Sequence, residues 1–187
     1  MFGNGLSSSP SNTKEPFNGP DFPRVTICDN VVAQHKLVTE ELGITQLKLA
    51  AGFSMGGQQA YHWASLYPQM VNNLAPICSS AKCSPHNWLF LEGLISALTT
   101  DPIFDGGRYE SDPISGMRAL SHVWSGWMFS QEFFRNNKNS ELGLKTPKDV
   151  IAFAENRFMS QDANNLLLRL RAWQNSDISA NELYNGN

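Results

Sequence analysis

A serine surrounded by glycines is the residue of this chain whose type and spacing best fit chemistry. Ser54 is the centre of the stretch GFSMG, residues 52–56, which follows an apolar segment and precedes a run that ends at Pro68. A serine held in a sharp turn between a strand and a helix needs small residues two positions before and after it, because strand and helix pass close together. Gly52 and Gly56 meet that demand, which favours a nucleophilic serine over a chance match to the pentapeptide.

The residue after the serine has a matching role in such a turn. The backbone N–H of Met55 would point into the same space as Ser54 Oγ, and the positive end of the following helix would help it stabilise an oxyanion. A serine hydroxyl is a weak nucleophile at neutral pH and needs a base. The next question is therefore which histidine could serve.

None of the four histidines of the chain is well placed to be that base. His62 lies on the predicted helix after Ser54, about 12 Å further along its axis. His35 and His86 are expected to pack at or near helices, and His122 is the best local candidate. We predict that no histidine or carboxylate of this chain lies within roughly 2.6 to 3.2 Å of Ser54 Oγ. Five aspartates lie in predicted loops or at predicted helix starts, where we expect them to cap helices or to be solvated charges. They are Asp101, Asp105, Asp112, Asp162 and Asp177.

Residues 1–83 predict an α/β arrangement. Residues 1–24 are rich in Ser, Asn, Pro and Gly and predict a loop. Asp29 or Asn30 is expected to cap a helix that ends near Gly43. A strand of about six residues then leads into the Ser54 turn. A helix and a second strand, within residues 71–80, complete a βαβ unit with parallel pairing.

Residues after position 84 predict helices only. Ser84 is expected to cap the first of these helices, with Pro85 at its first position. Thr146 is expected to cap a later one. A stretch between them, residues 112–137, is expected to be a helix that breaks near its glycines. Its Trp124 and Trp127 either line an acyl or acceptor pocket or belong to the core of the helical part, and the helical spacing favours the core.

Composition excludes several functional classes. A net charge of −3 without a run of like charges argues against nucleic acid and anionic membrane surfaces as partners. The chain has no apolar stretch long enough to span a membrane. Three cysteines without metal-type spacing are expected to be free thiols, and no metal site is expected. These features favour a cytoplasmic protein.

Several segments together resemble one branch of a known superfamily. The stretches DNVVAQ (residues 29–34), GFSMGGQQAYHWASLYP (residues 52–68) and DANNL (residues 162–166) resemble the homoserine O-acetyltransferase-like branch of the α/β-hydrolases in order and spacing. The likeness implies an α/β class, as a partial α/β-hydrolase fold with a parallel sheet fragment and an inserted helical cap. It also implies Ser54 as nucleophile and Met55 N–H as oxyanion donor.

The resemblance further implies how the chain is divided. Residues 1–83 match part of the core, residues 84–178 match the cap, and residues 179–187 begin the return to the core. The family's aspartate and histidine match positions beyond Asn187, and its first strands match positions before Met1, so the chain is expected to be a fragment.

Two functional interpretations follow from the resemblance. One is an acyltransferase or esterase that works through an acyl-Ser54 intermediate on small-molecule acyl donors and acceptors. It would need no bound cofactor beyond a possible acyl-CoA co-substrate. The other is a truncated chain or pseudoenzyme that acts by binding, if at all. A homodimer is possible in either case.

Overall fold

Two short parallel strands and the helix between them carry Ser54. In the computed structural model of the protein, which describes residues 1–184, β1 (Ala50–Phe53) leads through Ser54 into α2 (Met55–Leu66), and β2 (Leu74–Ile77) returns beside β1. The pairing is parallel and places Ala50 opposite Leu74. The predicted βαβ unit is thus confirmed.

Both strands are shorter than predicted. β1 and β2 have four residues each. The apolar residues that precede them pair only through an isolated bridge between Leu47 and Val71. The apolar pattern therefore extends further than the regular hydrogen-bonded ladder.

The helix before β1 begins earlier than predicted, which corrects the expected cap. Helix α1 (Ile27–Lys36) starts at Thr26, whose Oγ1 accepts a hydrogen bond from Asp29 N at 3.1 Å. Asp29 Oδ2 in turn accepts from Thr26 N at 2.8 Å. Asp29 is thus the third helical residue of a capping box and not the cap that the sequence predicts, because aspartate is favoured both at a cap and in the first turn. Asn30 lies inside the helix and donates to Thr26 O.

The second half of the chain is helical, as predicted. The caps at Ser84 and Thr146 are confirmed, because each side chain accepts a hydrogen bond from the backbone N–H three residues on. The predicted break near the glycines falls at Gly126. The elements outside the βαβ unit and α1 are η1 (Gly19–Asp21), η2 (Leu37–Glu41), α3 (Pro85–Thr99), η3 (Pro102–Gly107), α4 (Ile114–Ser125), α5 (Gln131–Arg135), α6 (Lys138–Glu141), α7 (Pro147–Phe158) and α8 (Ala163–Gln174).

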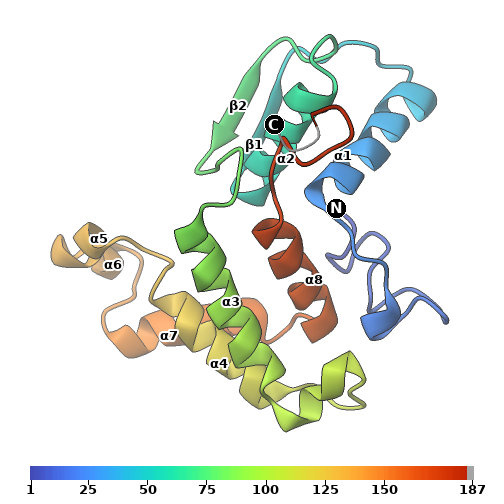
Figure 1. The fold of residues 1–187 in the computed structure, drawn as a ribbon. Helices are drawn as coiled ribbons and strands as arrows, with labels where there is room; N and C mark the ends of the chain where they lie inside the picture. Colours follow the sequence, from blue (N-terminus) through green and yellow to red (C-terminus); the bar gives the residue numbers. More distant parts are fainter. Residues whose placement is uncertain (185–187) are drawn as a thin grey trace.

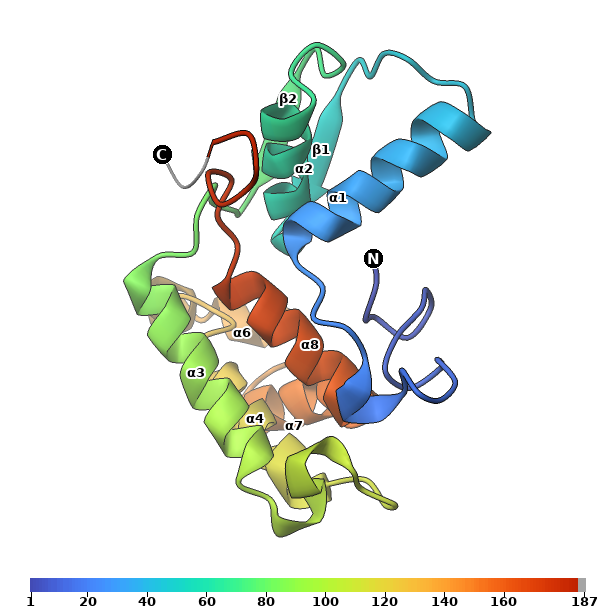
Figure 2. The ribbon, with the colours of Figure 1, turned by 45° about the vertical axis from the view of Figure 1, so that its right-hand side comes forward.

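The elements gather into two groups, each with its own apolar core (Figures 1 and 2). In the first group α1 and α2 lie beside the strands, and the core contains Val31 and Trp63. In the second group α3 packs against α4 and α8, and α4 against α7, around a core that contains Leu94 and Leu120. None of the described helices combines the length and the apolar character needed to cross a lipid bilayer.

Two antiparallel segments join these groups. The connection from β2 to α3 runs beside the segment that leaves α8, and Cys83 N donates to Ser176 O at 2.8 Å. Lys82 Nζ lies 2.5 Å from Asp177 Oδ2 in an ion pair across the same junction. The chain then passes beside α2, where Ser65 Oγ donates to Ile178 O. Of the predicted return segment, residues 179–187, the last three lie outside the described residues.

Helix α2 contains a buried imidazole that couples the stability of this helix to pH. His62 is 2% exposed, and its Nδ1 lies 2.9 Å from Gln58 O. Burial lowers the pKa of His62 below its ordinary value. The unfolded chain therefore binds a proton at His62 more readily than the folded chain does. The contribution of neutral His62 to the free energy of unfolding is thus fully present above about pH 6.5 and is lost as the pH falls.

We predict that the free energy of unfolding falls between about pH 7 and about pH 5, and falls less in a His62→Gln variant. Glutamine keeps a polar side chain of similar size but does not titrate in this range. Urea denaturation at both pH values measures the effect. An equal pH dependence in the two proteins would show that His62 does not contribute it.

Candidate active site

Ser54 has the unusual backbone conformation expected at the strand-to-helix turn. It lies between β1 and α2 with φ 54° and ψ −123°. Such a conformation costs an L-residue about 1–3 kcal/mol and persists only where its surroundings enforce it. Here Ser54 N donates to Ile77 O at 2.9 Å, and Ser54 O accepts from Gly57 N at 2.9 Å. The backbone is thus fixed on both sides, and within residues 1–184 no hydrogen bond engages Ser54 Oγ.

Close approach of strand and helix explains two of the glycines. A Cβ on Gly52 would lie 2.1 Å from the carbonyl carbon and oxygen of Gly56. A Cβ on Gly57 would lie 2.5 Å from Ser79 Cβ. A Cβ on Gly56, however, would meet nothing within 4 Å. The expectation that Gly56 must be small is therefore wrong: its backbone faces Gly52, but its own side-chain position is open, and the second crowded position is Gly57.

The first turn of α2 offers unpaired donors next to Ser54. Met55 and Gly56 are the first two residues of the helix, so their N–H groups have no acceptor within it. The helix dipole adds partial positive charge at this end. The predicted donor, Met55 N–H, follows Ser54 directly.

A small cavity borders Ser54. Its volume is about 290 Å³, and its lining residues come from α2, from the end of β2, from α3 and from α8. The helical group therefore covers the serine. The lining residues are Ser54, Gln58, Cys78, Ser79, Ser80, Asn87 and Trp173.

Sequence reasoning missed most of this lining. The residues just after β2, Cys78 to Ser80, could have been found, because the carboxyl ends of neighbouring parallel strands meet at one edge of a sheet. Asn87 and Trp173 could not, since their positions depend on how α3 and α8 pack over the sheet.

Two polar side chains of the lining have unsatisfied atoms. Gln58 is 2% exposed, and its Oε1 has no hydrogen-bond partner among the described residues. The same holds for Ser79 Oγ. A buried polar group without a partner costs about 1–3 kcal/mol, so such groups call for an explanation.

Trp124 and Trp127 do not border this cavity. Trp124 packs in the helical group, with its ring 5.1 Å from that of Phe158 and 6.0 Å from that of Trp173. Trp127 is 49% exposed and stacks on Phe90. Trp124 thus follows the core interpretation, and the indole beside Ser54 is Trp173.

The histidines lie elsewhere, as expected. His122 Nε2 is 3.0 Å from Glu155 Oε1 at the surface of α4 and α7. The ring of His35 stacks on Tyr67 at 3.7 Å, and that of His86 lies 4.8 Å from Trp127. Within residues 1–184 no histidine or carboxylate lines the Ser54 cavity.

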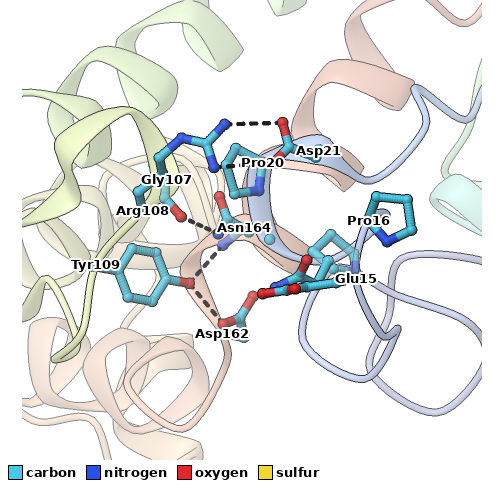
Figure 3. A pocket seen from close by; sticks show the side chains of 12 residues that line it. Glu15, Pro16, Pro20, Asp21, Gly107, Arg108, Tyr109, Asp162 and Asn164 are labelled. Carbon is cyan, nitrogen blue, oxygen red and sulfur yellow. Dashed lines mark hydrogen bonds and ion pairs between the residues drawn. The ribbon is translucent and has the colours of Figure 1, made fainter.

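A larger cavity, of about 560 Å³, lies between the N-terminal loop, η3 and the start of α8 (Figure 3). Dashed lines in Figure 3 join Arg108 to Asp21, Tyr109 to Asp162 and Asn164, and Asn164 to Gly107, but none reaches Glu15. Arg108 contacts both oxygens of Asp21 at 3.0 Å, and Tyr109 Oη donates to Asp162 Oδ2 at 2.7 Å. Burial, together with this hydrogen bond, raises the pKa of Tyr109, so the phenol stays protonated. The arrangement fastens the loop to the helices and offers no activated nucleophile.

Comparison with known proteins agrees with this geometry. The family profile described as the alpha/beta hydrolase fold matches residues 1–119. The chain belongs to this family. The strand, serine turn, helix and strand of residues 50–77 lie within the matched part, and the helices from α4 onward lie largely beyond it.

Similar proteins within the family include esterases. An ethyl acetate hydrolase from Pseudomonas veronii is 43% identical over 182 residues, which are 96% of this chain and 52% of that protein. The solved structure of the acetyl esterase MekB superposes with a TM-score of 0.94 and 42% identity, over 99% of this chain and 54% of the other. The chain thus spans about half the length of the curated relatives it matches.

The predicted branch is also represented. A homoserine O-acetyltransferase from Methanococcus vannielii is 38% identical over 124 residues, which are 64% of this chain and 25% of that protein. The chain therefore resembles both hydrolases and acyltransferases. Over nearly the whole chain, its identity to the ethyl acetate hydrolase, 43%, exceeds the 34% to a homoserine O-acetyltransferase from Desulfotalea psychrophila, which covers 93% of the chain.

Alanine substitutions at the glycines around Ser54 are expected to affect the stability of the fold to different degrees. Gly52→Ala forces a Cβ into backbone and is expected to prevent folding. Gly57→Ala is expected to lower the free energy of unfolding by about 1–3 kcal/mol, because the Ser79 side chain must move. Gly56→Ala is expected to be neutral or to stabilise by up to about 1 kcal/mol, because alanine favours helix and the space is open.

Circular dichroism shows whether Gly52→Ala folds. Urea denaturation measures the other two variants, and Gly56→Ala is the matched control for Gly57→Ala. Equal effects at positions 56 and 57 would contradict the close approach of Ser79 to α2.

Proposed function

We propose that Ser54 is the nucleophile of an esterase that hydrolyses small acyl esters, acetyl esters first among them, through an acyl-Ser54 intermediate. The observation that carries the proposal is the backbone of Ser54, held at positive φ at the start of α2 beside the unpaired N–H of Met55. A nucleophile elbow of the α/β-hydrolase fold requires such a backbone at its serine, which supports the proposal.

The reaction would run in two steps. In the first, Ser54 Oγ bonds to the ester carbonyl carbon, Met55 N–H donates to the oxyanion, and the alcohol leaves with the serine's proton. In the second, a water oxygen bonds to the acyl carbon, the bond from that carbon to Oγ breaks, and a proton from water restores the Ser54 hydroxyl. Residues 84–178 would act as the cap over the reacting carbon.

Hydrolysis of small esters is favoured over transfer to homoserine. Among relatives matched over most of this chain, an ethyl acetate hydrolase and an acetyl esterase are 42–43% identical, whereas homoserine acyltransferases are 32–34% identical. A cavity of about 290 Å³ is at the lower end of the range for ligand pockets, which suits a short acyl group. Acyl transfer, with acyl-CoA as a possible donor, is the second candidate, because homoserine O-acetyltransferases are also relatives.

The proposal requires a base that residues 1–184 do not place beside Ser54. An imidazole from outside these residues must take the serine's proton. Removal of triad members lowers the rate by several powers of ten even where the oxyanion site persists. The alternative is therefore a chain that binds ligands without turnover.

Added imidazole separates these two possibilities. We predict that the 187-residue chain alone hydrolyses phenyl acetate no faster than its Ser54→Ala variant. Free imidazole should then raise the Ser54-dependent rate by roughly tenfold or more, since a general base contributes at least that much when placed well. Phenol release is the measurement.

The Ser54→Ala variant with the same imidazole gives the background. Equal rates in both proteins with imidazole would overturn the proposed nucleophile. Fast Ser54-dependent turnover without imidazole would instead locate a base within the chain, with His122 the first residue to replace.

A further inference from the structure

Two buried polar atoms in the cavity of Ser54, Gln58 Oε1 and Ser79 Oγ, have no hydrogen-bond partner among the described residues. Gln58 lies in the first turns of α2, is 2% exposed, and has no partner for Oε1 among the described residues. Ser79 follows β2, and its Oγ is also buried and unpaired. Both side chains line the cavity of Ser54.

The adjacent glutamine and serine, Gln59 and Ser80, form side-chain hydrogen bonds, unlike Gln58 Oε1 and Ser79 Oγ. Gln59 Oε1 accepts a hydrogen bond from Gln34 Nε2 at 2.5 Å. Ser80 Oγ donates to Lys82 O at 2.8 Å. A third buried hydroxyl without a partner, Ser176 Oγ, lies outside the serine cavity. Two of the three unpaired atoms among the described residues therefore line the cavity of Ser54.

The missing partner must be a hydrogen-bond donor. Gln58 Oε1 is an acceptor, whereas an ester offers acceptor oxygens only. Ser79 Oγ can donate or accept. A small molecule with an O–H group satisfies both, and the second step of the proposed reaction uses such a molecule.

We propose that Gln58 and Ser79 form the subsite for the acyl acceptor, a water or a small alcohol, beside Ser54. The inference rests on the proposed function. Gln58 would accept the acceptor's O–H and so direct its oxygen toward the acyl carbon. The new carbon–oxygen bond replaces the bond to Ser54 Oγ, which regains a proton that the acceptor gives up. Both residues act as positioning residues and exchange no proton themselves.

Acylation of Ser54 and decay of acetyl-Ser54 can be measured separately in the variants Gln58→Met and Ser79→Ala. Imidazole is present throughout, and Gln59→Met is the control. The kcat/KM for phenyl acetate reports acylation, and the decay of acetyl-Ser54, followed by intact-protein mass after removal of the ester, reports the second step. We expect acylation within about twofold of the unchanged protein. The decay should slow by roughly fivefold to tenfold, the loss of about one hydrogen bond.

Stability gives an independent readout. Because methionine removes an unsatisfied buried polar group, Gln58→Met should be as stable as the unchanged protein or more so, whereas Gln59→Met loses a formed hydrogen bond. A decay rate equal to that of the control, or a parallel loss of acylation, would overturn the acceptor subsite while acetyl-Ser54 still forms. Absence of any acetyl-Ser54 would overturn the proposed function and this inference with it.

Discussion

The close approach of Gly52 to the first turn of α2 is the constraint on which the site depends. Because no Cβ fits between Gly52 and the Gly56 backbone, β1 can pass into α2 within one residue. That residue, Ser54, is then driven to positive φ and is held there by hydrogen bonds to β2 and to α2. The strain is thus stored in a serine whose neighbouring N–H groups, those of Met55 and Gly56, have no acceptor within α2.

The helical group completes the site from the other side. The ion pair between Lys82 and Asp177 and the backbone contact between Cys83 and Ser176 join the entry and exit of this group in one short ladder. They set where α3 and α8 begin and end, and hence where Asn87 and Trp173 meet the serine cavity. A compact polar space over Ser54 results, although the residues that form it are far apart in sequence.

Local signals predicted local structure well. The turn at Ser54 and the helix caps at Ser84 and Thr146 rest on residue types that act within a few positions, and the structure has them. The cap at Thr26 was missed because Asp29 fits two positions of one motif. The lining could be predicted only in part: Ser79 follows from strand parallelism, whereas Trp173 depends on helix packing over distance, which no local pattern encodes.

Selective reactivity of Ser54 is the most direct test of this account. An activated phosphonate ester should phosphonylate a serine whose oxyanion site is preformed much faster than an ordinary serine. Peptide mapping by mass spectrometry after such a reaction, with imidazole present, locates the adduct. We expect a single adduct on Ser54 that disappears when the chain is denatured first. Adducts spread over several serines, or a native chain that leaves Ser54 unmodified, would contradict the claim that the turn makes a nucleophile of this residue.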